Sequence, residues 1–176
     1  ISLKKSASLK HYKLQAEDLN SYHISNIYSD LQSSSSYEFF LLSIGSLLSR
    51  NTIISNLQGN QAKSNINSAY LCKSKQHSDI TTEIKHQLPG GISSQKVFGV
   101  VDNSSTGVFQ GKVNVYKDAQ DSDADQLSRG LILTSDSQVN YKPMLEINAN
   151  DVKCSHGVSI GELDEDYLFY LQSRGI

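Results

Sequence analysis

The stretch VFQGKVNVY, Val108 to Tyr116, decides the fold class of this chain. Val113 and Val115 face one way, whereas Lys112 and Asn114 face the other. This alternation has the period of two that a half-buried β-strand requires, because successive side chains of a strand point to opposite faces. The stretch therefore predicts a strand with one apolar face and one polar face.

Similar short segments, separated by Gly, Asn, Asp and Ser, follow one another from Leu57 onward. We expect further strands at Ile80–Lys85, Gln95–Val101, Leu131–Thr134, Gln138–Tyr141, Met144–Ala149 and Val152–Ile160. A sandwich, a barrel or a coiled β-solenoid would each fit many short strands. Tight hairpins are poorly signalled, since the sequence holds no Asn-Gly or Asp-Gly pair. The pattern therefore favours an all-β parallel β-helix, although it shows no clean repeat period.

Composition divides the chain. Residues 1–55 differ in composition from the rest of the chain, although no linker separates the two parts. We expect residues 1–55 to form early coils or flanking elements of the core. Their apolar cluster, from Tyr37 to Leu48, fits either a buried strand or part of a short helix. Residues 56–162 are the predicted β-helix core.

The last segment, residues 163–176, predicts a helix. Asp164 fits an N-cap, and Gly175 fits a C-terminal stop. Tyr167, Leu168 and Leu171 lie three and four residues apart, so they would form an apolar side of this helix. We expect this segment to be the start of a C-terminal helical domain that is truncated in this chain.

The 176 residues carry a formal net charge of −2 with scattered Lys and Arg, so we expect no nucleic-acid partner. No run approaches the ~18 apolar residues of a membrane span. The N-terminus shows no export signal, which favours a cytoplasmic protein without a membrane partner. Two cysteines are too few for a disulfide scaffold, which fits a reducing compartment. Because Ile1 is not a start Met, we expect a piece of a longer chain.

Cys154 and His156 are the candidate site residues. If residues 152–160 form a strand, side chains two apart share a face, which sets a thiol beside an imidazole, and both can bind iron. Two ligands do not complete a metal site, so the rest would come from elsewhere in the fold or from another subunit. Cys154 as a small buried hydrophobe and His156 as an ordinary hydrogen-bonded histidine stay open. A Cys–His nucleophile lacks a visible third member or oxyanion signature.

Three other patterns do not support a site. The acidic run from Asp118 to Asp125 lacks the Gly and Glu of a calcium loop, and we interpret it as a solvated corner between strands. Gly107–Lys112 has one residue too few for a phosphate loop and reads as strand interior whose glycines permit close packing of coils. The last pattern consists of Cys72, His77 and His86. Their spacings in the sequence match no zinc-binding motif, so we expect them to have structural or surface roles.

Three ordered motifs resemble one protein family. SDADQLSRGLIL, Ser122–Leu133, resembles a family stretch that reads T-D-A-x-Q-x-x-R-x-L-L-L. GVFQGKVNV, Gly107–Val115, is similar to the same family's GVFQGKI segment, and Lys142–Ile176 resembles the long signature that closes its core domain. This is the SufB/SufD family of iron–sulfur cluster assembly scaffold proteins.

Within that family the chain resembles SufD members. It reads KCSHGVS at Lys153–Ser159, where SufB members read E-H-E-A-T. The departures from the family pattern are small: Gly130 stands where Asn is commoner, and Val158-Ser159-Ile160 replaces A-T-V.

The resemblance implies a right-handed parallel β-helix core and a scaffold without turnover chemistry of its own. SufD members pair with SufB through their β-helices, and the ATPase SufC docks on a helical domain at the C-terminal end. A transient iron–sulfur cluster forms at the SufB–SufD interface. His156 matches the histidine associated with that interface, and Cys154 is its same-face neighbour. We expect no cluster on the isolated chain, weak recruitment of SufC, and a homodimer as an alternative assembly.

Two functions of other classes stay open. A β-helix can be an extracellular polysaccharide-active enzyme, which would need clustered carboxylates and basic residues on one outer face, and the absence of an export signal counts against it. The other is a self-associating structural β-solenoid, because an exposed flank of a β-helix can pair edge to edge.

Overall fold

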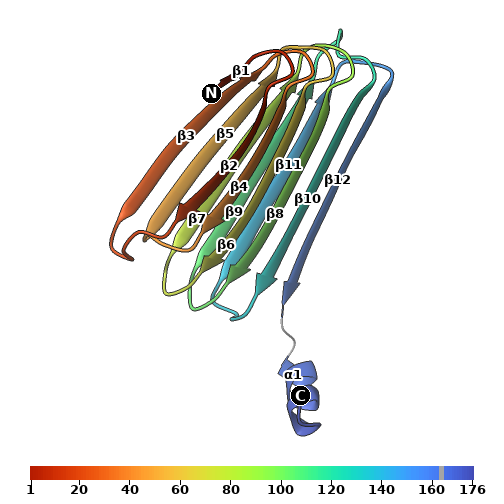
Figure 1. The fold of residues 1–176 in the computed structure, drawn as a ribbon. Helices are drawn as coiled ribbons and strands as arrows, with labels where there is room; N and C mark the ends of the chain where they lie inside the picture. The colour runs from red at the N-terminus through yellow and green to blue at the C-terminus, as the bar shows by residue number, and fades with distance from the viewer. Residues whose placement is uncertain (163–164) are drawn as a thin grey trace.

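The computed structural model describes residues 1–162 and 165–176, and it shows a parallel β-solenoid followed by a short helix (Figure 1). Within this described part the strands are β1 (Ser2–Leu3), β2 (Ser8–Gln15), β3 (Tyr22–Leu31), β4 (Ser36–Ser43), β5 (Leu48–Leu57), β6 (Lys63–Cys72), β7 (His77–His86), β8 (Ile92–Val101), β9 (Thr106–Val115), β10 (Ser122–Ile132), β11 (Gln138–Ile147) and β12 (Val152–Glu162). The helix, α1, spans Glu165–Ser173.

The strands form two six-stranded sheets, one from the odd-numbered strands and one from the even-numbered strands. Every ladder is parallel, so the chain crosses from one sheet to the other and returns once in each coil. The prediction of an all-β parallel β-helix with a short C-terminal helix is confirmed. The absence of hairpin turns in the sequence has its cause in this topology, because no two consecutive strands pair directly.

Strand β9 shows how the alternating pattern builds the core. Val113 and Val115 are fully buried between the two sheets. Lys112 points outward, where its Nζ lies 2.9 Å from a carboxylate oxygen of Glu146 on β11. Gly107, at the start of the same strand, packs against the ring of Tyr70, whose hydroxyl would lie 2.1 Å from a Cβ at that position. The predicted role of the β9 glycines in close packing is confirmed.

Successive coils share one corner geometry. Each even-numbered strand from β2 to β10 is preceded by a residue with positive φ, two residues before the strand in β2 to β8 and one residue before it in β10. These residues are 28, 27, 29 and 31 positions apart in sequence: Ser6, Ser34, Gln61, Gly90 and Asp121. Backbone N–H groups at these corners donate to the corner of the next coil, for example from Ser34 to the carbonyl of Asn60 at 2.9 Å. The corners therefore stack into a ladder along one flank.

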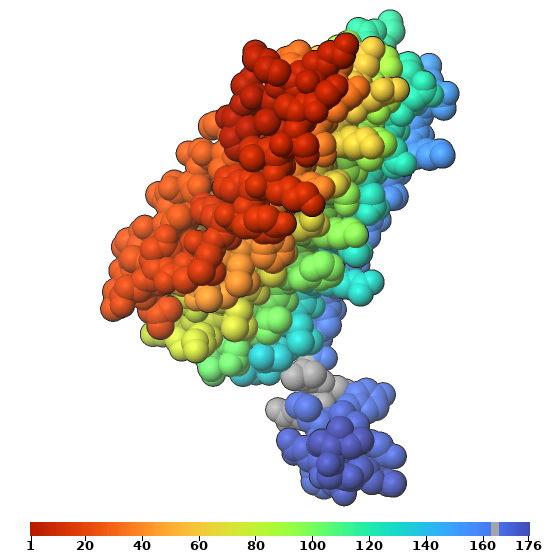
Figure 2. Space-filling view, viewed as in Figure 1, coloured from red at the N-terminus to blue at the C-terminus, as the bar shows by residue number. Residues whose placement is uncertain are grey.

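The coils begin near the N-terminus. Residues 1–55 form β1 to β4 and most of β5, which itself crosses residue 55. The apolar cluster from Tyr37 to Leu48, which fitted a strand or a helix, forms β4 and the start of β5. Figure 2 shows the coils following one another from red to blue across the body, at an angle to the strand direction.

The interpretation of the acidic run as a corner is wrong for half of it. Asp121 lies at a corner, but β10 begins at Ser122 and carries Asp123 and Asp125 on its outer face. Of the strand predicted at Leu131–Thr134, only Leu131 and Ile132 belong to the end of β10, and the prediction is wrong for Leu133 and Thr134. The sequence did not predict the start of β10, because three of the five residues from Asp121 to Asp125 are acidic and Asp is uncommon in strands.

The helix ends as predicted. Gly175 has a φ of +81°, its N–H donates to the carbonyl of Gln172, and the N–H of Ile176 donates to that of Leu171. These two bonds form a Schellman motif, which satisfies carbonyls at a helix C-terminus. The predicted N-cap, Asp164, lies outside the described residues. In the described part of the chain, no helix has the length and apolar character to cross a bilayer.

Candidate functional site

The two candidate ligands lie on β12, which is the edge strand of the even-numbered sheet. In the register of β12 on β10, Cys154 lies beside Ala124 and His156 lies beside Gln126, and both of these β10 residues are buried inside the solenoid. Cys154 and His156 therefore share the inward-facing side of the last coil. Ser155 between them points outward, where its hydroxyl donates to Asp125 Oδ1 at 2.6 Å.

Cys154 is half-buried in a small apolar cluster. It packs near Val113, Val115, Ala119, Ala124 and Ala149. Burial raises the pKa of the Cys154 thiol, and the negative charge of Asp123 raises it further. The neutral thiol is therefore favoured, whereas the thiolate is both the nucleophile and the metal ligand. A metal ion or a positive group brought to this thiol would have to supply the missing stabilisation.

His156 is exposed, whereas Gln126, which lies opposite it on β10, is buried. The Gln126 side chain is 1% exposed, and neither its Nε2 nor its Oε1 has a hydrogen-bond partner. The strand order alone brings this pair together, since β12 adds onto β10 thirty residues later with His156 opposite Gln126.

Cys154 and His156 do not complete a metal site by themselves. Within residues 1–162 and 165–176, no three His, Cys, Asp or Glu side chains gather in a way that could hold an ion. Two donors of the types that iron accepts are present, so the residues fit a partial contribution to a cluster, and further ligands have to come from outside this chain's described part.

The last coil presents an exposed apolar surface around these residues. We use the term C-terminal end face for the inward-facing residues of β12, namely Cys154, His156, Val158 and Ile160. Val158 and Ile160 are 44% and 45% exposed, and β11 and β12 are the edge strands of the two sheets at this end.

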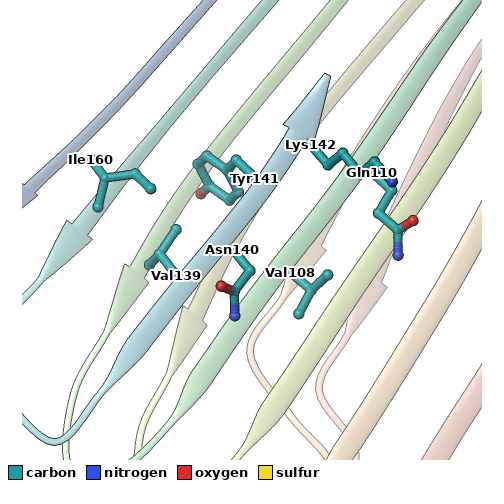
Figure 3. A pocket seen from close by; sticks show the side chains of 7 residues that line it. All are labelled: Val108, Gln110, Val139, Asn140, Tyr141, Lys142 and Ile160. Atoms are coloured by element: carbon teal, nitrogen blue, oxygen red, sulfur yellow. The ribbon is translucent and has the colours of Figure 1, made fainter. Parts of the chain in front are cut away.

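A hollow of about 510 Å³ adjoins the C-terminal end face (Figure 3). Ile160 lines one side of it, and side chains of β9 and β11 line the rest: Val108, Gln110, Val139, Asn140, Tyr141 and Lys142. Figure 3 shows the side chains of Val139 to Lys142 along the edge strand β11, with Val108 and Gln110 on one side of this strand and Ile160 on the other. Ile160 is therefore shared by the hollow and the C-terminal end face.

The other sequence candidates lie elsewhere. Cys72 is buried, and burial raises the pKa of its thiol to about 12. His86 is fully buried, its Nε2 lies 2.8 Å from Ser93 Oγ, and burial lowers its pKa to about 4. His77 begins β7 at a coil corner. None of them joins Cys154 and His156 in a cluster within the described residues.

Two polar features were missed by the sequence analysis. One is Gln126, whose inward direction was hidden when the acidic run around it was placed in a corner. The other is a chain of contacts at the opposite end, where Lys13 Nζ lies 2.9 Å from His23 Nε2 and His23 Nδ1 lies 2.7 Å from Glu17 Oε1. Lys13 also donates to Asn51 Oδ1 at 2.7 Å. No local spacing signals this cluster, because it depends on which strands stack.

Comparison with known families fits this geometry. The whole chain, residues 1–176, matches the family model described as "SUF system FeS cluster assembly, SufBD core domain". The chain therefore belongs to the SufBD core domain family of the SUF system for iron–sulfur cluster assembly.

Within this family, the chain is similar to proteins named SufD. The chain is 38% identical to the chloroplastic protein ABCI7 of Arabidopsis thaliana over 177 residues, which cover all of this chain and 37% of that protein. It is 32% identical to the iron–sulfur cluster assembly protein SufD of Escherichia coli, covering all of this chain and 42% of that protein. SufD of Bacillus subtilis is 30% identical over 77% of this chain and 31% of its own length. The chain thus spans well under half of these relatives, and its resemblance to SufD proteins is confirmed.

Proposed function

We propose that this chain is the scaffold core of a SufD-type subunit, which pairs with a SufB-type partner through the C-terminal end face. The observation that carries the proposal is that the half-buried Cys154 and the exposed His156 lie where both sheets end in an edge strand. Edge strands offer unpaired backbone groups to an incoming strand. Val158 and Ile160 add apolar surface, so a partner would bury the end face and its two candidate ligands together.

The proposed cargo is a transient iron–sulfur cluster, assembled between the two subunits rather than retained as a cofactor. His156 would contribute a ring nitrogen and Cys154 a sulfur, and the partner would supply the remaining ligands. Because the pKa of the Cys154 thiol is raised, iron would have to displace the thiol proton on binding, since the ligand is the thiolate. In this proposal the chain holds and positions iron and sulfide but catalyses no reaction of its own.

The proposal assigns α1 to the region on which a SufC-type ATPase docks. The helix lies apart from the coils in Figure 1, directly after β12, and Tyr167, Phe169 and Tyr170 are more than half exposed. ATP-driven movement of this region would then be transmitted to the adjacent end face. The two free cysteines are consistent with a reducing compartment for this work.

The proposed docking surface can be tested with Asp substitutions on the two edge strands of the even-numbered sheet, β12 and β2. We expect Val158→Asp combined with Ile160→Asp to weaken the complex with a SufB-type partner at least about tenfold in isothermal titration calorimetry, equivalent to about 1.4 kcal/mol. Leu14→Asp is the matched control, since Leu14 is 66% exposed on β2, the opposite edge of the same sheet. Equal affinities for all three proteins would refute docking at the end face.

A second assembly, a homodimer, is favoured by the same open edges. Two copies could pair through β11 and β12, with one copy in the place of the SufB-type partner. Sedimentation velocity of the chain alone distinguishes the assemblies, because a homodimer through the end face dissociates on the Val158→Asp and Ile160→Asp substitutions. A monomer that binds the SufB-type partner would exclude it as the working state.

A further inference from the structure

Gln126 has two hydrogen-bonding atoms in a place that solvent does not reach. Its side chain is 1% exposed, and both the Nε2 donor and the Oε1 acceptor lack a partner. Buried carboxamides are normally bonded, because an unmade hydrogen bond carries the full cost of removing the group from water. A glutamine that only filled space here would be less favourable than an apolar residue of the same shape.

The position of Gln126 in the solenoid leaves it few possible partners. Across the interior lies Gly111, where a Cβ would stand 3.0 Å from Gln126 Nε2, so the glycine makes room for the amide without bonding it. On the preceding coil its register neighbour is Gln95, whose Oε1 already accepts a hydrogen bond from the Thr82 hydroxyl and whose Nε2 donor is itself unpaired. That donor could occupy only one of the two lone pairs of Gln126 Oε1, so the amide oxygen keeps room for a second donor. On the following coil its register neighbour is His156.

His156 is the neighbour that can move. It lies on an edge strand, it is exposed, and its side chain faces the same interior as that of Gln126. Adjacent strands of a sheet lie about 4.8 Å apart, which puts an imidazole within reach of a glutamine amide after rotation about its side-chain bonds. A neutral imidazole carries one N–H donor and one acceptor nitrogen, so it can satisfy the amide oxygen.

We propose that Gln126 is the positioning residue of His156, with Oε1 accepting a hydrogen bond from one ring N–H. The other ring nitrogen then keeps its lone pair and is held toward the C-terminal end face. Histidine ligands of metals commonly donate their second ring N–H to a fixed acceptor, which sets the tautomer and the direction of the ligating nitrogen. The importance of this role for cluster assembly rests on the proposed function, whereas the hydrogen bond itself does not.

The choice of glutamine fits a sealed position. A carboxylate at residue 126 would bring an unpaired charge into the interior, which is far more costly than a neutral amide. The carboxamide thus orients the ring without adding charge beside Cys154, whose thiol pKa is already raised by burial and by Asp123.

The test reads the tautomer of His156 directly. Ring-nitrogen NMR of the chain labelled with ¹⁵N-histidine is recorded above the ordinary histidine pKa range, and His156→Ala identifies the His156 signals among the five histidines. In the wild type we expect the two His156 nitrogens to show the widely separated shifts of one dominant tautomer. In Gln126→Leu the separation should shrink toward that of free histidine.

Gln95→Leu is the matched control. It removes a glutamine that is equally buried in the same row, one coil farther from His156, and should leave the His156 signals unchanged. Gln126→Met repeats the experiment with a flexible side chain, so that the result does not depend on how well Leu packs. Identical His156 shifts in the wild type, Gln126→Leu and Gln126→Met would overturn the proposal.

The outcome separates this inference from the proposed function. If the ring signals respond to Gln126 but His156→Ala leaves cluster assembly intact, the positioning role holds and the proposed function fails. If His156→Ala abolishes assembly while Gln126→Leu leaves the ring signals unchanged, the proposed function stands and the positioning role is wrong.

Discussion

Hydrogen bonding of the buried polar side chains is more complete in the first coils of the solenoid than in the later ones, where paired and unpaired groups occur together. The hydroxyls of Ser29, Ser55 and Ser64 form a chain with two contacts of 2.9 Å. In the described residues, every buried side-chain N or O atom without a partner lies between Ser68 and Ser128. An unmade buried hydrogen bond costs about 1–3 kcal/mol. The later coils therefore keep hydrogen-bonding capacity that the fold does not use, on the side of the molecule that ends in His156.

The polar side chains at the two ends of the solenoid also differ in how many of their hydrogen-bonding groups have partners. At the first coils Lys13 lies between His23 and Asn51, and Glu17 bonds the far side of the His23 ring. At the last coil no protein group completes the pair of Cys154 and His156 within the described residues. The N-terminal cluster satisfies itself, whereas the C-terminal pair is open to another molecule.

The largest contrast is expected within one row of the even-numbered sheet, which holds Phe39 near one end and His156 at the other. Phe39 is 1% exposed and packs against Tyr37. We expect Phe39→Ala to reduce the free energy of unfolding by about 3–5 kcal/mol in urea denaturation, because it leaves a core cavity. His156→Ala should stay within about 0.5 kcal/mol of the wild type. A large loss from His156→Ala would show that His156 is a structural residue.

A smaller effect is expected from His86, which lies between the two ends. Burial lowers its pKa to about 4 from an ordinary 6.5, while Asp123 opposes the shift. As the pH falls through 6.5 the unfolded chain binds a proton that the folded chain binds only near pH 4, so stability is lost across that window, on the order of 3 kcal/mol. His86→Gln should remove this part of the loss in urea denaturation from neutral pH to about pH 4. An unchanged pH dependence would place the titration elsewhere.

The smallest contrast compares Asn51, whose amide is hydrogen-bonded inside the fold, with Gln126, whose proposed partner lies on the exposed edge strand. Asn51 is buried, accepts a hydrogen bond from Lys13 and donates one to Ser49 at 3.1 Å. We expect Asn51→Leu to cost about 1–3 kcal/mol, because the Lys13 and Ser49 groups lose their partner. Gln126→Leu should stay within about 1 kcal/mol of the wild type or be more stable. Equal losses in thermal or urea unfolding would remove the distinction between the two halves of the interior.

The sequence predicted the fold class, and the reason lies in β9. Its alternation of Val113 and Val115 with polar neighbours, together with the lack of hairpin turns, is a property of single strands that a parallel coil preserves. The repeat was not predictable, since the corner ladder is built by Ser6, Gln61 and Asp121 among others. Different residues adopt the same positive φ at unequal spacing, so the period exists in backbone geometry and not in residue identity.

The candidate site was predictable in part. Spacing along one strand was enough to set Cys154 and His156 on one face. The placement of His156 opposite Gln126 depends on the register of β12 on β10, which single-strand patterns do not contain. The raised pKa of the Cys154 thiol likewise depends on burial in the apolar cluster that the fold gathers around it.

The shared-site account is tested most directly by anaerobic reconstitution with iron and sulfide, followed by visible absorption and Mössbauer spectroscopy. The chain alone should stay colourless, and its mixture with a SufB-type partner should gain the absorption of a cluster. His156→Ala should lose that absorption while the mass of the complex, measured by sedimentation, stays the same. A cluster on the chain alone, or an unchanged cluster with His156→Ala, would contradict the account.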